Sequence, residues 1–344
     1  MYTVRAFKRG KQPYQMSMAT RVLITGSNSG LGYLTALHLS LRGDCDVLLA
    51  CRTVSKAKEA AFAINSTSTS TSSLAVPIQA PLDLLDPTTV HSFVDHVAHH
   101  HGPIDVLINN AGVFLSEKFK ETTMINAIAP TLLTTLLKPT TRTVSIITAP
   151  KGQASIDYPR VADLNGTSFN QLHQYFHSKQ LLSCAMTHLA SQKIGGQHVL
   201  LGPGSVDTGI HSKDLLAATP FWIKAFMKLN TFFYHGTPES ASASIVNAAI
   251  GAFDGVPMAV EDVKDVKDVK DVKDVKDVKE VKEVKEVKEA KDTDTEEASN
   301  DGVDGNSVQV VDLGIILDEV LCNNVVRNRE LYEAMMDAVG NEYL

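Results

Sequence analysis

The amino-acid sequence predicts an α/β domain in which helices cover both faces of one doubly wound, parallel sheet. Short apolar runs alternate with helix-length segments between residues 21 and 202. A glycine-rich turn follows the first of these runs and leads directly into a helical pattern. The chain is 44% hydrophobic and only 21% charged, which is enough apolar material for a sizeable core.

The apolar runs have the length of strands and lack strict alternation, so we expect both of their faces to be buried. They span 21–25, 46–51, 75–80, 104–109, 143–148 and 197–202. Helix-length segments lie between them, as at 31–42, 87–101 and 174–193. Because strand–helix–strand crossovers are right-handed, this order predicts one parallel sheet.

The C-terminal third contains a charged repeat that does not fit this core. Over 262–291 a triplet of Asp or Glu, then Val or Ala, then Lys repeats ten times. Each triplet turns about 300° in an α-helix, so the valines form no fixed apolar face. We expect 261–305 to be a disordered or transiently helical low-complexity insertion, with a folded partner-binding arm as the alternative. The fold would resume with a strand at 308–313 and an amphipathic helix at 327–339.

These boundaries predict a single domain, made of 21–260 and 306–344, behind a basic leader at 1–20. The leader has no acidic residue and no apolar core, so a secretory signal is excluded. A disordered leader is expected, and a mitochondrial presequence or a later start at Met16 or Met18 are the alternatives.

The net charge of −7 belongs to the insertion, because 261–305 holds 17 acidic and 10 basic residues. The remainder is balanced, which argues against a nucleic-acid partner. No apolar run approaches the roughly 18 residues of a membrane span. The cysteines have no ligand-like spacing, so we expect reduced thiols and a cytoplasmic location. The adjacent histidines at 99–101 point apart on a helix, so we expect no metal site there either.

The turn after the first run reads TGSNSGLG over 25–32. Glycines at a strand-to-helix turn let the backbone approach a pyrophosphate, which the helix N-terminus favours. The cofactor-binding residues predicted here are Gly26, Ser27, Asn28, Ser29, Gly30, Leu31 and Gly32.

With its TGxxxGxG spacing, the sequence resembles the short-chain dehydrogenase/reductase family. Further matches follow in that family's order: Asp83, Asn109-Asn110-Ala111-Gly112, Asn126, Tyr175-Phe-His-Ser-Lys179 and Pro203-Gly-Ser-Val-Asp-Thr208. The resemblance covers nearly all of 21–260 and more loosely 306–344. It is strongest to the retinol dehydrogenase and protochlorophyllide reductase-like branch, and it implies a Rossmann-type fold.

The resemblance also implies a mechanism, in which hydride passes between a nicotinamide cofactor and a carbonyl carbon. Tyr175 would be the acid/base, Lys179 would tune it and hold the ribose, and Asn126 would support a water that leads protons to that lysine. Asp83 would fix the adenine and Thr208 the nicotinamide. The other implied cofactor contacts are Asn109, Ala111, Gly112, Pro203 and Val206.

Tyr175 and Lys179 are four residues apart, so a helix places them on one face. A lysine ammonium beside a phenol favours the phenolate, and we therefore expect Lys179 to lower the pKa of Tyr175.

Two positions depart from the family's pattern. Thr148 stands where a serine usually binds the substrate carbonyl, and threonine keeps the hydroxyl. Ser145 and Ser155 are the alternatives, or no hydroxyl serves and the protein is a catalytically weak nucleotide-binding regulator. Pro130 follows Asn126 closely and is expected to disturb the helix end and move that asparagine.

Arg52 and Lys56 follow the second run, at the place where an acidic residue would accept a hydrogen bond from the ribose 2′-hydroxyl of NAD(H). An arginine fork suits a 2′-phosphate, so NADP(H) is favoured over NAD(H).

The segment 219–233 carries the only tryptophan and four of twelve phenylalanines. It is interpreted as a wall over a lipophilic alcohol or carbonyl substrate, such as a retinoid, steroid or secondary metabolite. Membrane-surface contact and plain lid packing are the alternatives. The resemblance adds a homodimer or tetramer through helices such as 87–101 or 174–193.

Overall fold

The computed structural model describes residues 20–67, 74–114, 119–148, 171–203, 237–251, 308–312, 325–337 and 339. Its centre is a seven-stranded sheet in the order β3-β2-β1-β4-β5-β6-β7, in which every neighbouring pair is parallel. The strands are β1 (Thr20–Thr25), β2 (Cys45–Ala50), β3 (Ala75–Pro77), β4 (Val106–Asn109), β5 (Arg142–Ile146), β6 (Gln197–Gly202) and β7 (Val308–Asp312). This confirms the predicted doubly wound α/β fold.

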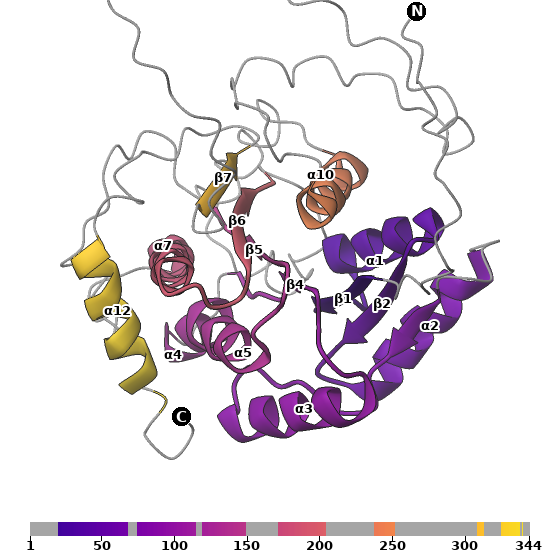
Figure 1. Cartoon of the computed structure of the whole chain (residues 1–344), viewed down its shortest axis with the longest axis horizontal. Coiled ribbons are helices and arrows are strands. Elements are labelled where there is room, and N and C mark those ends of the chain that lie inside the picture. Colours follow the sequence, from indigo (N-terminus) through magenta and orange to yellow (C-terminus); the bar gives the residue numbers. More distant parts are fainter. Residues whose placement is uncertain are drawn as a thin grey trace, which may run out of the picture.

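Helices cover both faces of the sheet (Figure 1). One face carries α1 (Gly30–Arg42), α2 (Val54–Thr67) and α10 (Pro238–Ile250). The other carries α3 (Pro87–His100), α5 (Ala129–Leu137), α7 (Gln171–Ser191) and α12 (Val325–Asp337). The short helix α4 (Phe119–Thr123) and a π-helical turn, η1 (Met124–Ile128), lead directly into α5.

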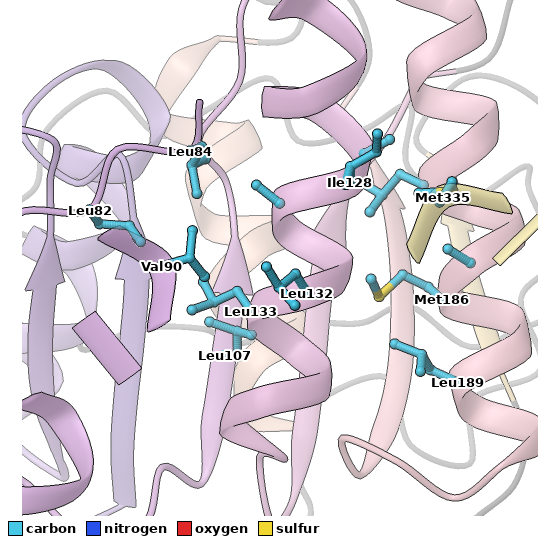
Figure 2. Packing of buried hydrophobic residues seen from close by; sticks show 14 of the residues in the cluster. Leu82, Leu84, Val90, Leu107, Ile128, Leu132, Leu133, Met186, Leu189 and Met335 are labelled. Carbon is cyan, nitrogen blue, oxygen red and sulfur yellow. The ribbon is translucent and has the colours of Figure 1, made fainter. Parts of the chain in front are cut away.

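The strand interiors are mostly apolar because both faces are covered, as the continuous runs predicted; Thr143 and Ser145 of β5 and His198 of β6 are buried polar exceptions. Leu107 of β4 packs against Leu132 and Leu133 of α5, while Ile108, its neighbour, faces the α1 side. Figure 2 shows the first of these layers, with Val90 of α3 beside the leucines.

Strands β3 and β5 end at least two residues before their apolar runs do. β3 ends at Pro77, which has no N–H for the ladder, although Ile78 and Leu82 still donate to the carbonyls of Leu49 and Cys51 at 3.1 and 3.0 Å. β5 ends at Ile146, two residues before the predicted limit. These ends matter because loops at the C-terminal edge of the sheet carry the site.

The predicted C-terminal strand and helix are both present. β7 pairs with β6, and α12 lies on the outer side of α7, where Met335 faces Met186 (Figure 2). The insertion at 261–305, residues 1–19 and residues 68–73 lie outside the described residues, so the domain limits stay predictions. Within the described part of the chain, no helix is long and apolar enough to cross a membrane.

Candidate active site

The glycine turn between β1 and α1 is shaped so that backbone can approach a ligand. Gly26 and Gly30 adopt φ values of +66° and +56°, a region that side chains disfavour. A Cβ on Gly32 would lie 2.5 Å from the Gly26 carbonyl oxygen and would also meet the Asn110 amide. Ser29 precedes α1 in an extended conformation and its side chain makes no capping hydrogen bond. The N–H groups of the first turn therefore face the glycine loop, an arrangement that suits a pyrophosphate.

Two residues that the sequence analysis did not assign hold this turn in place. Asn110 donates from Nδ2 to the carbonyl of Thr25 at 2.8 Å. Thr25 Oγ1 in turn accepts from the backbone N–H groups of Asn110 and Ala111, at 3.1 and 3.0 Å. The glycine turn is thus tied to the loop that follows β4.

Asn109, expected to contact the cofactor, has its side chain inside the domain instead. It is only 3% exposed, and its Nδ2 donates to Thr134 Oγ1 at 3.0 Å. Ser145 Oγ lies 3.5 Å from the same nitrogen. Consecutive residues at the end of a strand point to opposite sides, so Asn110 faces the glycine turn and Asn109 faces α5.

The end of β2 lies beside the glycine turn, as the NADP(H) prediction requires. Ser27 Oγ is 3.5 Å from Cys51 Sγ, and both side chains are buried. Arg52 and Lys56 are exposed next to them. Burial raises the pKa of the Cys51 thiol, so it is present as the neutral thiol near neutral pH. Arg52 is free to reach a ligand at this edge.

Asp83, in the loop after β3, is partly exposed at the same edge of the sheet. Its Oδ1 accepts from the backbone N–H of Leu85 at 3.0 Å, and its own N–H donates to Thr89 Oγ1 at 3.2 Å. These bonds fix the loop expected to meet the adenine.

Asn126 lies in the π-turn η1, is completely buried, and uses its whole amide. Oδ1 accepts from the N–H of Val113 at 2.8 Å, and Nδ2 donates to the Val113 carbonyl and to Ser178 Oγ at 2.9 and 3.0 Å. The side chain therefore links the loop after β4 to α7.

Pro130 was expected to disturb the helix end and move Asn126, but a π-turn precedes it in the structure. Pro130 occupies the first turn of α5, immediately after the π-turn, where Ala129 donates to the carbonyl of Met124 five residues earlier. A proline has no N–H, so it cannot give the Asn126 carbonyl the i+4 donor of a regular α-helix. The widened turn accommodates the proline, and the Asn126 side chain keeps all three hydrogen bonds.

Tyr175 and Lys179 both project from α7 near the C-terminal edge of β4 and β5. Lys179 is 4% exposed, and its Nζ donates to the carbonyl of Ile146 at 2.8 Å. A Cβ on Gly112 would lie 3.5 Å from that nitrogen, an ordinary contact, and 3.1 Å from Asn126 Oδ1, which is tight, so Gly112 lies directly beside both side chains. The Tyr175 ring meets the edge of Phe114, with centroids 4.7 Å apart and planes at 88°.

Burial, rather than a neighbouring charge, decides the protonation of both groups. It raises the pKa of Tyr175 to about 12 and lowers the pKa of Lys179 to about 8. The expected lowering of the Tyr175 pKa by Lys179 is therefore opposite in direction to the shift in this structure. The phenol keeps its proton at neutral pH.

The hydroxyl candidates occupy different environments. Thr148 is partly exposed, two residues beyond the end of β5, whereas Ser145 is completely buried within that strand. Because Ser145 is completely buried, its hydroxyl cannot contact a substrate. Pro203 follows β6 directly, but Ser155, Val206, Thr208 and the segment 219–233 lie outside the described residues.

Comparison with known proteins places these residues in a family. A family model described as short chain dehydrogenase matches residues 20–149. Human retinol dehydrogenase 14 is 30% identical over 281 residues, which cover 74% of this chain and 80% of that protein. The chain belongs to the short-chain dehydrogenase/reductase family.

Other relatives support the same branch and the same fold. Dehydrogenase/reductase SDR family member 13 of Bos taurus is 29% identical, over 60% of this chain and 55% of that protein. Short chain dehydrogenase sor7 of Hypocrea jecorina is 27% identical, over 67% and 71%. A crystal structure of L-sorbose reductase from Gluconobacter frateurii, complexed with NADPH and L-sorbose, shares the fold with a TM-score of 0.50, 20% identity, and coverage of 67% and 90%. The chain is thus a short-chain alcohol oxidoreductase of the retinol dehydrogenase-like branch, a family that uses NAD(P)(H).

Proposed function

We propose that this dehydrogenase interconverts an alcohol and a ketone or aldehyde with NADP(H), using Tyr175 as the acid/base. The observation that carries the proposal is the shared position of Tyr175 and Lys179 on α7, with the Lys179 ammonium above Gly112 and bonded to Ile146. This position lies at the same edge of the sheet as the glycine turn.

The residues around the turn fit a dinucleotide. Gly26 and Gly32 leave room for backbone approach, and the first turn of α1 offers N–H groups to a pyrophosphate. When bound, the cofactor supplies or accepts the hydride at its nicotinamide. We assign the protein's own part of the chemistry to binding, orientation and proton transfer.

Tyr175 suits proton donation to a carbonyl oxygen. Its raised pKa keeps the phenol protonated at neutral pH. Lys179 has a pKa of about 8, so it gains and loses its proton close to the working pH and would help to resupply the proton that Tyr175 gives up. Thr148 is our candidate for the hydroxyl that orients the substrate carbonyl, because it alone of the described hydroxyl candidates is accessible.

The preference for NADP(H) rests on the edge of β2. Arg52 and Lys56 are exposed beside the buried Ser27–Cys51 pair, and no acidic residue ends the strand. A guanidinium suits a ribose 2′-phosphate better than a 2′-hydroxyl.

A lipophilic substrate is proposed from the relatives' names and from the aromatic contact beside Tyr175. The relatives include retinol dehydrogenases 12, 13 and 14. Phe114 lies edge-on to the Tyr175 ring and supplies apolar surface where a substrate carbonyl would be held. The aromatic segment 219–233 would add the wall of the pocket, or touch a membrane surface.

The remaining proposals concern the whole chain. We propose one domain over 21–260 and 306–344, interrupted by the insertion at 261–305, and a cytoplasmic protein, since the described cysteines are buried and form no disulfide with one another. Packing of α12 over α7 covers much of one helix expected to form a dimer, so an oligomer would use another face.

Oxidation of NADPH or NADH with retinal, decanal, a steroid ketone and glyceraldehyde tests the function directly. The proposal predicts faster turnover with NADPH and with the three lipophilic carbonyls. Best activity with glyceraldehyde would refute the substrate class, and a preference for NADH would refute the role of Arg52.

A further inference from the structure

We propose that Ser178 is a positioning residue for the reaction, which fixes Tyr175 through a closed ring of contacts between α7 and the loop after β4. This inference rests on the proposed acid/base role of Tyr175. It assigns a function to the serine immediately before Lys179, which touches no reacting atom in this account, and it gives Phe114 a second role as a support for the Tyr175 ring.

Ser178 is completely buried, and its hydroxyl bonds to partners on two different elements. Its Oγ donates to the Tyr175 carbonyl at 2.7 Å, one turn earlier on the same helix. The same oxygen accepts from Asn126 Nδ2 at 3.0 Å. One hydroxyl therefore joins the residue that carries the phenol to a side chain of another element, and both of its roles are used.

Asn126 passes this link on to the loop. Its two remaining hydrogen bonds go to the N–H and carbonyl of Val113, at 2.8 and 2.9 Å. An amide that accepts once and donates twice has only one orientation here, because a flip would set N–H against N–H and oxygen against oxygen. The position of Val113 relative to α7 is fixed in consequence.

Phe114 closes the ring of contacts. It follows Val113 directly and meets the Tyr175 ring edge-on, at 4.7 Å between centroids. Tyr175 is thus held at its backbone by Ser178 and at its ring by Phe114, and both supports depend on the same asparagine. A phenol that must deliver a proton has to be placed within hydrogen-bond reach of its target, and an error of about 1 Å can cost 10²-fold in rate.

The other hydroxyls on α7 differ from Ser178 in one respect. Ser183 and Thr187 are buried too, but their hydroxyls donate to the carbonyls of Lys179 and Ser183 on their own helix, at 2.9 and 2.8 Å. They connect no second element to Tyr175. Ser183 is therefore the matched control for the loss of a buried helix hydroxyl.

The test compares Ser178→Ala, Ser183→Ala, Phe114→Leu and Tyr175→Phe in the full-length protein. Steady-state reduction of retinal with NADPH gives kcat and KM, NADPH titration gives Kd, and a thermal scan gives Tm. We expect Ser178→Ala to lower kcat by tenfold or more, with Kd for NADPH within twofold of wild type. Ser183→Ala should keep kcat within twofold, and Phe114→Leu should lower kcat without weakening NADPH binding.

Several outcomes would overturn the proposal. Near-normal kcat in Ser178→Ala, in a protein that Tyr175→Phe inactivates, would remove the positioning role and leave the proposed function intact. Equal losses of kcat and Tm in Ser178→Ala and Ser183→Ala would mean that α7 is merely destabilised. If Ser178→Ala does not fold, Phe114→Leu decides, and unchanged kcat there refutes the inference. Normal turnover in Tyr175→Phe would instead refute the proposed function.

Discussion

Replacing Asn126 with alanine should cost the protein about 3 kcal/mol of unfolding free energy. The substitution removes hydrogen bonds to Val113 N–H, the Val113 carbonyl and Ser178 Oγ. Each neutral hydrogen bond contributes about 1 kcal/mol net, and a group left buried without a partner costs about 1–3 kcal/mol. Val113 is partly exposed, so water offsets part of that penalty, and the better helix propensity of alanine returns about 0.5 kcal/mol.

Equilibrium urea unfolding and a thermal scan measure this loss. In a domain of this size, about 3 kcal/mol corresponds to a fall in Tm of roughly 6–12 °C. Thr135→Ala is the control, because that side chain is on α5 and bonds only within its helix, to the Thr131 carbonyl at 2.9 Å. It should lose less than about 1 kcal/mol. An Asn126→Ala protein as stable as this control would show that the three contacts do not hold the loop to α7.

Three further substitutions test other parts of the account. Arg52→Glu should raise the Kd for NADPH by tenfold or more while leaving the Kd for NADH within threefold, since a charge-assisted bond contributes about 1.5–3 kcal/mol; parallel losses for both cofactors would contradict the 2′-phosphate assignment. Gly32→Ala should abolish NADPH binding, because its Cβ would meet the Gly26 carbonyl oxygen at 2.5 Å, and titration by fluorescence detects this; retained affinity would mean that the turn can open. In the wild type, the free energy of unfolding should rise between about pH 8 and pH 10.5, because burial lowers the pKa of Lys179 to about 8 in the folded state and only the unfolded chain binds that proton in this window. The rise should amount to up to about 3 kcal/mol, and Lys179→Met should remove it. Wild-type unfolding curves that are flat across this range would contradict the burial of the ammonium.

The parallel sheet and both helix layers could be predicted because covered parallel strands leave continuous apolar runs in the sequence. Boundaries were less accurate wherever one residue interrupts the hydrogen-bond ladder. Pro77 ends β3 although the apolar run continues to residue 80. The π-turn at Met124–Ile128 could not be predicted, because its effect depends on how the helix meets Pro130.

The motif residues of the candidate site could be named from the sequence, but the residues that support them could not. Asn109 and Asn110 are adjacent in sequence, and only strand alternation separates the buried side chain from the one that faces the glycine turn. Ser178 could have been noticed, since it lies three residues after Tyr175 on one helix face. Its bond to Asn126 joins elements 52 residues apart, and no local pattern reveals it.

The pKa of Tyr175 is a further case. Spacing places Lys179 on the same helix face, which suggested a lowered pKa, yet spacing does not report burial. In the structure the ammonium bonds to the Ile146 carbonyl, and desolvation raises the pKa of the phenol to about 12. The direction of the shift follows from the surroundings and not from the motif.

The central claim is that Tyr175 transfers the proton in an NADPH-dependent carbonyl reduction. Single-turnover reduction of retinal by enzyme loaded with NADPH, compared between wild type and Tyr175→Phe, tests it most directly. The account predicts that the variant binds NADPH with a Kd within twofold of wild type and that its single-turnover rate falls at least 100-fold, within the range that general acid catalysis contributes. A variant that reduces retinal at the wild-type rate would contradict the account.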